Sequence, residues 1–242
     1  MSSKTLVIGD ACTDVFVYGE CTRLCPDVPA PVFVPKKTCS NGGMAANVAA
    51  NLQQLGTACD LMSNAEKTEK TRYVDQQTNY MFLRVDTGEE DVRRVEGLTK
   101  ELLSKYDAIV ISDYNKGFLI EEDIAFICQN HSTVFMDTKK ILGPWSTGAK
   151  FIKINEYEFN RTKHTVDNTD NMIITLREKG CEYQGERFPV ENVEVKDMSG
   201  AGDTFLAGLV AKYMETQDIR QAIVFANECA TEVVQRRGVG VV

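Results

Sequence analysis

The sequence lacks the residue patterns that usually build metal and disulfide sites. It has eight cysteines but no C-x-x-C pair, and its two histidines, His131 and His164, lie far from the cysteine-rich first third. Several cysteines, such as Cys128 and Cys229, stand in apolar segments, where a free thiol packs like a small hydrophobic side chain. This spacing argues against a structural zinc site and against a disulfide framework.

Excess positive charge and long apolar runs are also missing. The formal net charge is −8, which argues against nucleic acid or an anionic membrane surface as the main partner. No apolar run approaches the length of a membrane-spanning helix or a signal-peptide core. We therefore expect a cytoplasmic protein with a small-molecule partner, in which any phosphate is held by local donors.

The 242 residues, 43% of them hydrophobic, are enough to bury one full core, so residues 1–242 are predicted to form a single domain with a small appendage. Apolar strands are expected near residues 4–9, 57–62, 107–112, 133–137, 150–154 and 171–176, separated by helical or loop segments. This alternation is typical of βαβ units and predicts an α/β fold with a mostly parallel sheet. Helices are expected after the glycine turn at 41–43, after residue 202, and at about 218–236.

A second, smaller sheet is predicted from two other segments. Residues 28–35 are extended by their prolines, and residues 71–75 and 79–85 read as two strands. Residues 12–40 otherwise show no long periodic pattern, and residues 63–70 are expected to be a polar surface connection. The strands at about 28–36 and 71–86 are predicted to form a lid, whose exposed edges indicate pairing in a homodimer.

Polar residues end most strands of the predicted parallel sheet. They are Asp10, Asp113, Asp137, Asn155 and Thr175. Because parallel strands end at the same side of a sheet, these side chains are expected to border one ligand-binding crevice.

The segment from Gly200 to Asp203 predicts an anion site. Gly200, Ala201 and Gly202 form a turn that opens a helix, where unpaired backbone N–H groups attract a phosphate. A carboxylate at Asp203 would repel that phosphate, but it suits a site where a hydroxyl approaches and loses its proton. Taken alone, the segment is more often a capped turn, so the rest of the chain must decide.

Several motifs in chain order resemble those of one family. They are Val7-Ile-Gly-Asp10 with Asp14, Arg23-Leu-Cys-Pro-Asp-Val-Pro-Ala-Pro-Val32, Gly42-Gly43 with Ala46-Asn47, Ser112-Asp-Tyr-Asn-Lys-Gly117, Asp137-Thr-Lys139, Asn155-Glu-Tyr-Glu158, Thr175 with Gly180, and Asp197-Met-Ser-Gly-Ala-Gly-Asp203. Together they resemble the ribokinase-like (PfkB-type) carbohydrate kinases, most closely their heptose-7-phosphate kinase branch. The resemblance implies a ribokinase-like three-layer sandwich with a mostly parallel central sheet and a small β lid.

The resemblance also implies an activity and its residues. Asp203 would be the catalytic base, and Gly200, Ala201 and Gly202 would form the anion hole. The sugar or sugar phosphate would be bound by Asp14, Gly42, Gly43, Asn47 and Asp113, with Arg23, Arg84 or Lys116 holding an acceptor phosphate.

On the nucleotide side, the resemblance implies ATP with Mg²⁺ and a candidate K⁺. Residues implied near the nucleotide are Asp137, Lys139, Asn155, Glu158, Thr175, Gly180, Asn227 and Gly238. Asn155 and Glu158 would hold Mg²⁺ through water, and Asp197 is the candidate monovalent-cation ligand. The helix N-terminus is expected to keep Asp203 ionised.

The chain departs from the family pattern in places. It is shorter, with only a polar connection between Met62 and Arg72, a trimmed helix after Phe159, Met198 beside Asp197, and Arg177 where many relatives have glycine. Two alternatives therefore stay open: a kinase of an unphosphorylated sugar or nucleoside, and a degenerate nucleotide- or sugar-binding module.

Overall fold

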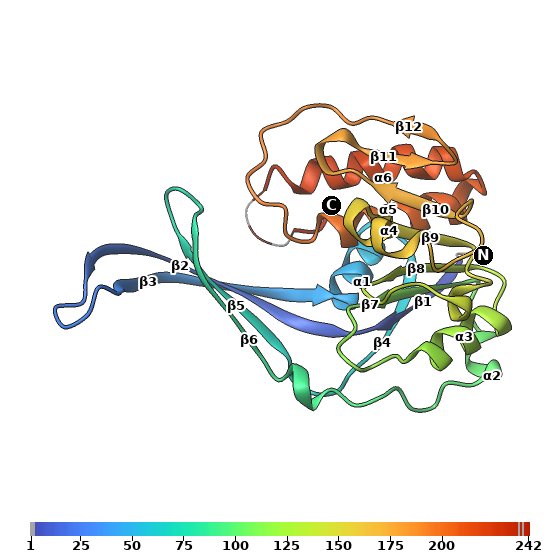
Figure 1. Ribbon diagram of the computed structural model, residues 1–242, viewed down its shortest axis with the longest axis horizontal. Helices are drawn as coiled ribbons and strands as arrows, with labels where there is room; N and C mark the ends of the chain where they lie inside the picture. The colour runs from blue at the N-terminus through green and yellow to red at the C-terminus, as the bar shows by residue number, and fades with distance from the viewer. Residues whose placement is uncertain (1–2, 237, 239) are drawn as a thin grey trace.

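The computed structural model describes residues 3–236, 238 and 240–242 and arranges their strands in two sheets (Figure 1). The larger, eight-stranded sheet has the order β12-β11-β10-β9-β8-β7-β1-β4. Its strands are β1 (Lys4–Gly9), β4 (Ala58–Ser63), β7 (Ala108–Asp113), β8 (Val134–Thr138), β9 (Phe151–Asn155), β10 (Met172–Thr175), β11 (Cys181–Tyr183) and β12 (Glu186–Phe188). All are parallel from β4 to β10, and only β11 and β12 pair antiparallel.

Helices cover both faces of this sheet. They are α1 (Ala45–Gln54), α2 (Lys100–Leu103), α3 (Glu121–Asn130), α4 (Glu156–Thr162), α5 (Ala201–Thr216) and α6 (Ile219–Val233), with short 3-10 turns η1 (Glu89–Asp91), η2 (Pro144–Ser146) and η3 (Arg177–Lys179). Side-chain oxygens cap several of them: Asn155 accepts from the backbone of Glu158, and Asp218 accepts from Arg220 and Gln221. Such caps satisfy N–H groups that have no partner within the helix.

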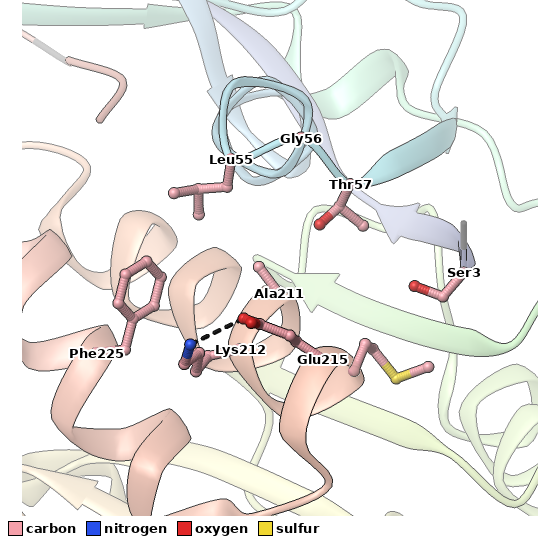
Figure 2. Close-up of a pocket in the computed structure, with 9 residues that line it drawn as sticks. Ser3, Leu55, Gly56, Thr57, Ala211, Lys212, Glu215 and Phe225 are labelled. Carbon is pink, nitrogen blue, oxygen red and sulfur yellow. Dashed lines mark hydrogen bonds and ion pairs between the residues drawn. The ribbon is translucent and has the colours of Figure 1, made fainter. Parts of the chain in front are cut away.

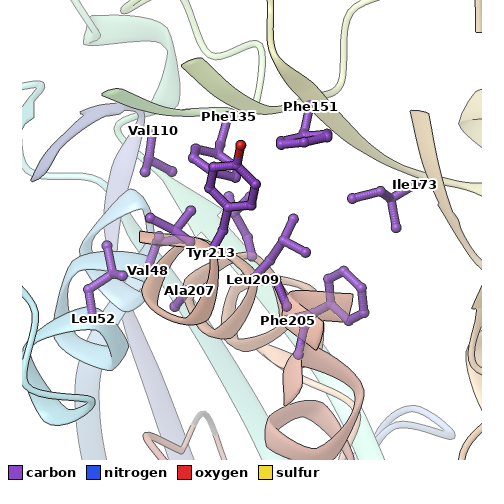
Figure 3. Packing of buried hydrophobic residues seen from close by; sticks show 14 of the residues in the cluster. Val48, Leu52, Val110, Phe135, Phe151, Ile173, Phe205, Ala207, Leu209 and Tyr213 are labelled. Carbon is purple, nitrogen blue, oxygen red and sulfur yellow. The ribbon is translucent and has the colours of Figure 1, made fainter. Parts of the chain in front are cut away.

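Two apolar cores lie on opposite faces of the eight-stranded sheet, because successive strand residues point to opposite sides. On one face, Val110, Phe135 and Phe151 pack against α1, α5 and α6 (Figure 3). On the other, Ile109 and Ile111 pack with residues of α2 and α3. The strand pattern's prediction of an α/β fold with a mostly parallel sheet is confirmed, and so is the three-layer sandwich that the resemblance implies.

The smaller sheet, which we call the arm, has the order β3-β2-β5-β6. Its strands are β2 (Ala11–Leu24), β3 (Pro31–Met44), β5 (Glu69–Asp75) and β6 (Met81–Thr87). β2 and β3 form a long hairpin that projects from the rest of the molecule, which we call the body (Figure 1). The separate small sheet predicted from the sequence is confirmed.

Several predicted boundaries were wrong. Residues 11–24 form a long strand where no periodic pattern was expected, and the proline-rich strand runs from 31 to 44 instead of about 28 to 36, so Gly42 and Gly43 end a strand. Residues 69 and 70 belong to β5 and not to a surface connection. Pairing explains these misses, because β2 pairs with β3 along nearly all of its length and with β5 from Thr13 to Gly19.

Within the described residues, no helix combines the length and apolar character needed to cross a membrane.

Candidate active site

The N-terminus of α5 forms the centre of the site. Gly200 caps the helix with φ at 81°, a left-handed conformation that favours glycine. Asp203 lies in the first turn and is only 5% exposed. The turn thus presents helix-start amides beside a buried carboxylate, as the segment 200–203 predicts.

Two neutral donors hold the Asp203 carboxylate. Asn47 Nδ2 donates to Oδ2 at 3.1 Å, and the Tyr114 hydroxyl donates to Oδ1 at 2.7 Å. Burial raises the pKa of Asp203 to about 6, while these two hydrogen bonds lower it. The pKa of Asp203 therefore lies above the ordinary value of a carboxyl group, because desolvation outweighs the two hydrogen bonds.

Tyr114 is a site residue that the sequence reasoning did not single out. Its loop follows β7 and is held by Asp10, whose carboxylate accepts from the backbone N–H of Tyr114, Lys116 and Phe118. The ammonium groups of Lys70 and Lys139 lie 5.2 and 5.4 Å from the centre of its ring. The Ser112–Gly117 motif was the available signal, but sequence alone did not show where this tyrosine points.

One side of the site is formed where the arm joins the body. Asp14 is buried and forms an ion pair with Arg72, which lies two residues along β5 from Lys70, the register partner of Asp14. Gly43 makes room for it, since an added Cβ would lie 2.1 Å from Asp14 Oδ2. We call this the acceptor side.

Further cations surround the acceptor side. Lys70 is buried 3.8 Å from Glu89, and Lys116 forms an ion pair with the same carboxylate. Arg84 lies opposite Arg72 in the β5–β6 pairing and binds Asp86 through two nitrogens, at 2.7 and 2.6 Å. Lys116 and Arg84 were expected here, whereas Lys70 and Arg72 were not.

Two predicted acceptor residues lie elsewhere. Arg23 pairs with Val32 near the far end of β2, and at about 3.3 Å per residue the strand from Asp14 spans about 30 Å, so Arg23 is not in this site. Asp113 is buried against Lys140, at 2.8 and 2.9 Å, and Thr138. It orders the turn after β8 and has no exposed face for a sugar.

A cavity of about 830 Å³ opens on the other side of the Gly200–Asp203 turn. Its lining includes the predicted residues Asp137, Lys139, Asn155, Thr175, Gly180, Ala201, Gly202 and Asn227. They come from the ends of β8, β9 and β10 and from α5 and α6. Of the strand-end residues, Asp137, Asn155 and Thr175 line this cavity, whereas Asp10 and Asp113 do not. We call it the nucleotide cavity after the ligand that the sequence resemblance implies for these residues.

A buried charge cluster forms one wall of this cavity. Asp137 Oδ2 lies 2.6 Å from Lys153 Nζ, and its Oδ1 lies 3.4 Å from Lys139 Nζ. Burial alone would raise the pKa of Asp137, but the two ammonium groups lower it below its usual value. Lys153 was not predicted as a site residue, although a lysine within the apolar strand 150–154 was a visible signal.

Asn155 and Glu158 form a reciprocal cap at the start of α4. Glu158 N donates to Asn155 Oδ1 at 2.8 Å, Asn155 N donates to Glu158 Oε2 at 3.0 Å, and Lys139 Nζ donates to Glu158 Oε1 at 2.8 Å. Asn155 lines the cavity, while Glu158 is directed into the cap. Asn155 Oδ1 and both carboxylate oxygens of Glu158 already accept hydrogen bonds, so the pair fits Mg²⁺ through intervening water.

Two other predicted positions lie outside the nucleotide cavity. Gly238 donates its N–H to Asp197 Oδ2 at 3.1 Å and lies near Tyr18 of the arm. Asp197 also accepts from Ser199 N at 2.9 Å, so its carboxylate orders the chain before the glycine turn. Neither residue lines the cavity. The nucleotide contact expected of Gly238 therefore does not agree with its position in the structure.

A smaller hollow of about 380 Å³ lies between the end of α1 and helices α5 and α6 (Figure 2). Lys212 and Glu215 form an ion pair across its floor at 2.8 Å. None of the predicted site residues lines it.

The chain resembles curated bacterial proteins in sequence. It is 29% identical to the bifunctional protein HldE of a Nitratiruptor species, over 98% of this chain and 63% of that protein. It is 30% identical to HldE of Helicobacter pylori, over 97% of this chain and 63% of that one. The first alignment spans 295 positions, more than the 242 residues here, so it contains gaps. The chain thus covers less than two thirds of these relatives.

Solved structures of other proteins have a similar fold. Ribokinase of Arabidopsis thaliana, solved with ribose and ATP, matches with a TM-score of 0.73 at 15% identity, over 98% of this chain and 94% of that one. Ribokinase of Thermotoga maritima gives 0.74 at 15% identity, with the same coverage. A model of the pfkB family of carbohydrate kinases matches residues 63–241. The chain therefore belongs to the PfkB family of carbohydrate kinases and has the ribokinase-like fold.

Proposed function

We propose that this protein is an ATP-dependent kinase of a sugar phosphate similar to heptose 7-phosphate. The observation that carries the proposal is the position of Asp203, buried at the glycine turn between the nucleotide cavity and the acceptor side. The catalytic base of a kinase must contact the acceptor hydroxyl on one side, while the phosphoryl group is bound on the other side. The roughly 30% identity to HldE proteins supports the heptose branch.

In the proposed reaction, the backbone amides of Gly200 to Gly202 bind the oxygens of the γ-phosphoryl group. The acceptor hydroxyl donates to Asp203, its oxygen forms the new bond to phosphorus, and the bond to the ADP oxygen breaks. The hydroxyl proton passes to Asp203. Asn47 and Tyr114 hold the carboxylate in place for this transfer.

The acceptor's own phosphate is proposed to bind Arg72, Lys70 and Lys116. Arg72 is paired with Asp14, where a sugar would be held, and Lys70 and Lys116 share the carboxylate of Glu89. A guanidinium with two ammonium groups suits a phosphate. Arg84 stands one strand further out and is proposed to add long-range attraction. With an unphosphorylated sugar, these cations would keep only their ion pairs with Asp14 and Glu89.

Metal ions would assist on the nucleotide side. Mg²⁺ held through water by Asn155 and Glu158 would neutralise charge on the nucleotide phosphates. Asp197 remains a candidate K⁺ ligand through its lone pairs not used by backbone N–H groups. The cytoplasm, where ATP is made, is the proposed compartment, and residues 1–242 are proposed to act as one kinase domain.

We further propose that two copies pair through their arms. Directly paired strand residues lie on the same face, which places Val17, Tyr73 and Leu83 together, away from the face that carries Arg72. Leu83 is 55% exposed, and Met81 and Val85 of the same strand are also exposed. A second copy would cover this apolar face and the arm's open edges.

The proposed function is tested by ATP consumption with heptose 7-phosphate, ribose and a nucleoside as acceptors. We expect turnover with heptose 7-phosphate and little with the others. Asp203→Asn should lower kcat by about 10²–10⁴-fold while ATP binding stays near wild type. Preference for ribose or a nucleoside would favour a kinase of an unphosphorylated acceptor. Binding without any turnover would favour a non-catalytic module.

A further inference from the structure

Lys153 is a buried lysine with an unusual position. It lies in β9 and is 5% exposed, within a strand whose other buried members are apolar. A lysine is almost never this deeply buried without a specific partner. Its position therefore requires a physical explanation.

The ammonium group points at the glycine turn. An added Cβ on Gly202 would lie 2.9 Å from Lys153 Nζ, so the nitrogen sits directly against this residue. Lys153, Ala201 and Gly202 line the same cavity. A phosphoryl group bound by the turn's amides would therefore be within reach of the ammonium group.

Compensation of Asp137 does not fully account for Lys153. Asp137 has a second cation, Lys139, 3.4 Å from Oδ1. An ammonium group has three N–H donors, and among the described residues Asp137 accepts from one of those of Lys153. The arrangement leaves donors beside the anion hole that a ligand can use.

We propose that Lys153 is a catalytic residue that binds a non-bridging oxygen of the transferring phosphoryl group. This inference rests on the proposed kinase function and adds a cation supplied by the chain itself to the glycine amides. In this role Lys153 donates hydrogen bonds and takes no part in the proton transfer. As the bond from phosphorus to the ADP oxygen breaks and the bond to the acceptor oxygen forms, Lys153 stabilises charge on the phosphoryl oxygens, while Asp203 takes the hydroxyl proton.

The test compares Lys153→Met with Lys150→Met. Methionine keeps most of the side-chain length and removes the charge. Lys150 lies just before the same strand, with its ammonium group 5.0 Å from the Tyr213 ring centre, outside the proposed site. We expect kcat to fall about 10²–10³-fold in Lys153→Met and to change less than about threefold in Lys150→Met.

Two binding measurements separate catalysis from a structural role. With Mg²⁺ present, Lys153→Met should bind ADP within about threefold of wild type but lose affinity for ADP with aluminium fluoride, which mimics the transferring group. Equal losses for both ligands would overturn the proposal in favour of a structural role. In Lys153→Ala, methylammonium should restore part of the rate, because it can occupy the space left by the side chain.

Further variants distinguish a folding defect from loss of function. If Lys153→Met does not fold, the double variant Asp137→Asn/Lys153→Met removes both charges, and its affinities for ADP and for ADP with aluminium fluoride are compared in the same way. Wild-type turnover combined with near-normal kcat in Lys153→Met would overturn only the role of Lys153. Absence of wild-type turnover would overturn the proposed function and this inference together.

Discussion

The nucleotide cavity and the acceptor side are built in different ways. The cavity lies at the ends of strands whose sheet is covered by helices on both faces, so its groups are fixed by two apolar cores. The acceptor side depends on the arm, where ion pairs such as Asp14 with Arg72 take the place of a core. Apolar side chains of the arm, among them Leu83, are exposed. If the arm binds the acceptor as proposed, substitutions in the arm should change acceptor choice with little effect on the body.

The strongest test of this separation is Arg72→Met. Loss of the guanidinium removes a charged contact to the acceptor and leaves Asp14 without its partner. We expect the acceptor KM to rise about 10–100-fold while the ATP KM changes less than about twofold. The reciprocal variant is Ala230→Phe, which puts a large side chain in the nucleotide cavity and should raise only the ATP KM. Steady-state kinetics in which Arg72→Met raises both constants alike would break the comparison.

A smaller effect on kcat/KM is expected from a change of pH, which acts on Asp203 between the nucleotide cavity and the acceptor side. The groups facing Asp203 are Tyr114, Asn47, Asp137 and Lys153, and burial leaves the pKa of Asp203 at about 6. Because the base must be ionised, kcat/KM should fall about tenfold per pH unit below 6 and level off above it. Tyr114→Phe removes a hydrogen bond that lowers this pKa, so the acid limb should move to higher pH.

An acid limb at the same pH in wild type and Tyr114→Phe would show that another group controls the profile. Circular dichroism at each pH is the control for unfolding.

The smallest effect on nucleotide binding is expected from Leu83→Glu. A carboxylate on the apolar face of the arm should convert a dimer to a monomer in sedimentation, with ATP affinity within about threefold of wild type. Leu61→Glu is the matched control, since Leu61 is 42% exposed on β4, at the edge of the body sheet. A wild-type monomer, or dissociation by both variants, would refute pairing through the arm.

The same division explains what the sequence predicts well. The parallel strands 4–9, 107–112 and 133–137 are local apolar runs, so their type and order could be predicted. The turn at Gly200 to Asp203 was equally visible, because its chemistry is contained in four consecutive residues.

Residues that depend on pairing between distant segments could not be predicted in the same way. Arg72 becomes important because β5 pairs with β2, and the sequence does not specify that register. Arg23 belongs to a specific motif, yet the length of β2 carries it far from Asp14. Tyr114 becomes a partner of Asp203 through a loop conformation that Asp10 fixes from another strand.

Tyr114 belongs to neither half alone, because its ring lies near the ammonium groups of both Lys70 of the arm and Lys139 of the body. An acceptor that draws Lys70 away, or a nucleotide that draws Lys139 away, would change the energy of the same aromatic side chain. Thermodynamic reciprocity then requires that each substrate alter the affinity of the other by the same factor. One ring in contact with two ammonium groups would thus make the two proposed binding equilibria interdependent, even though their binding sites are built separately.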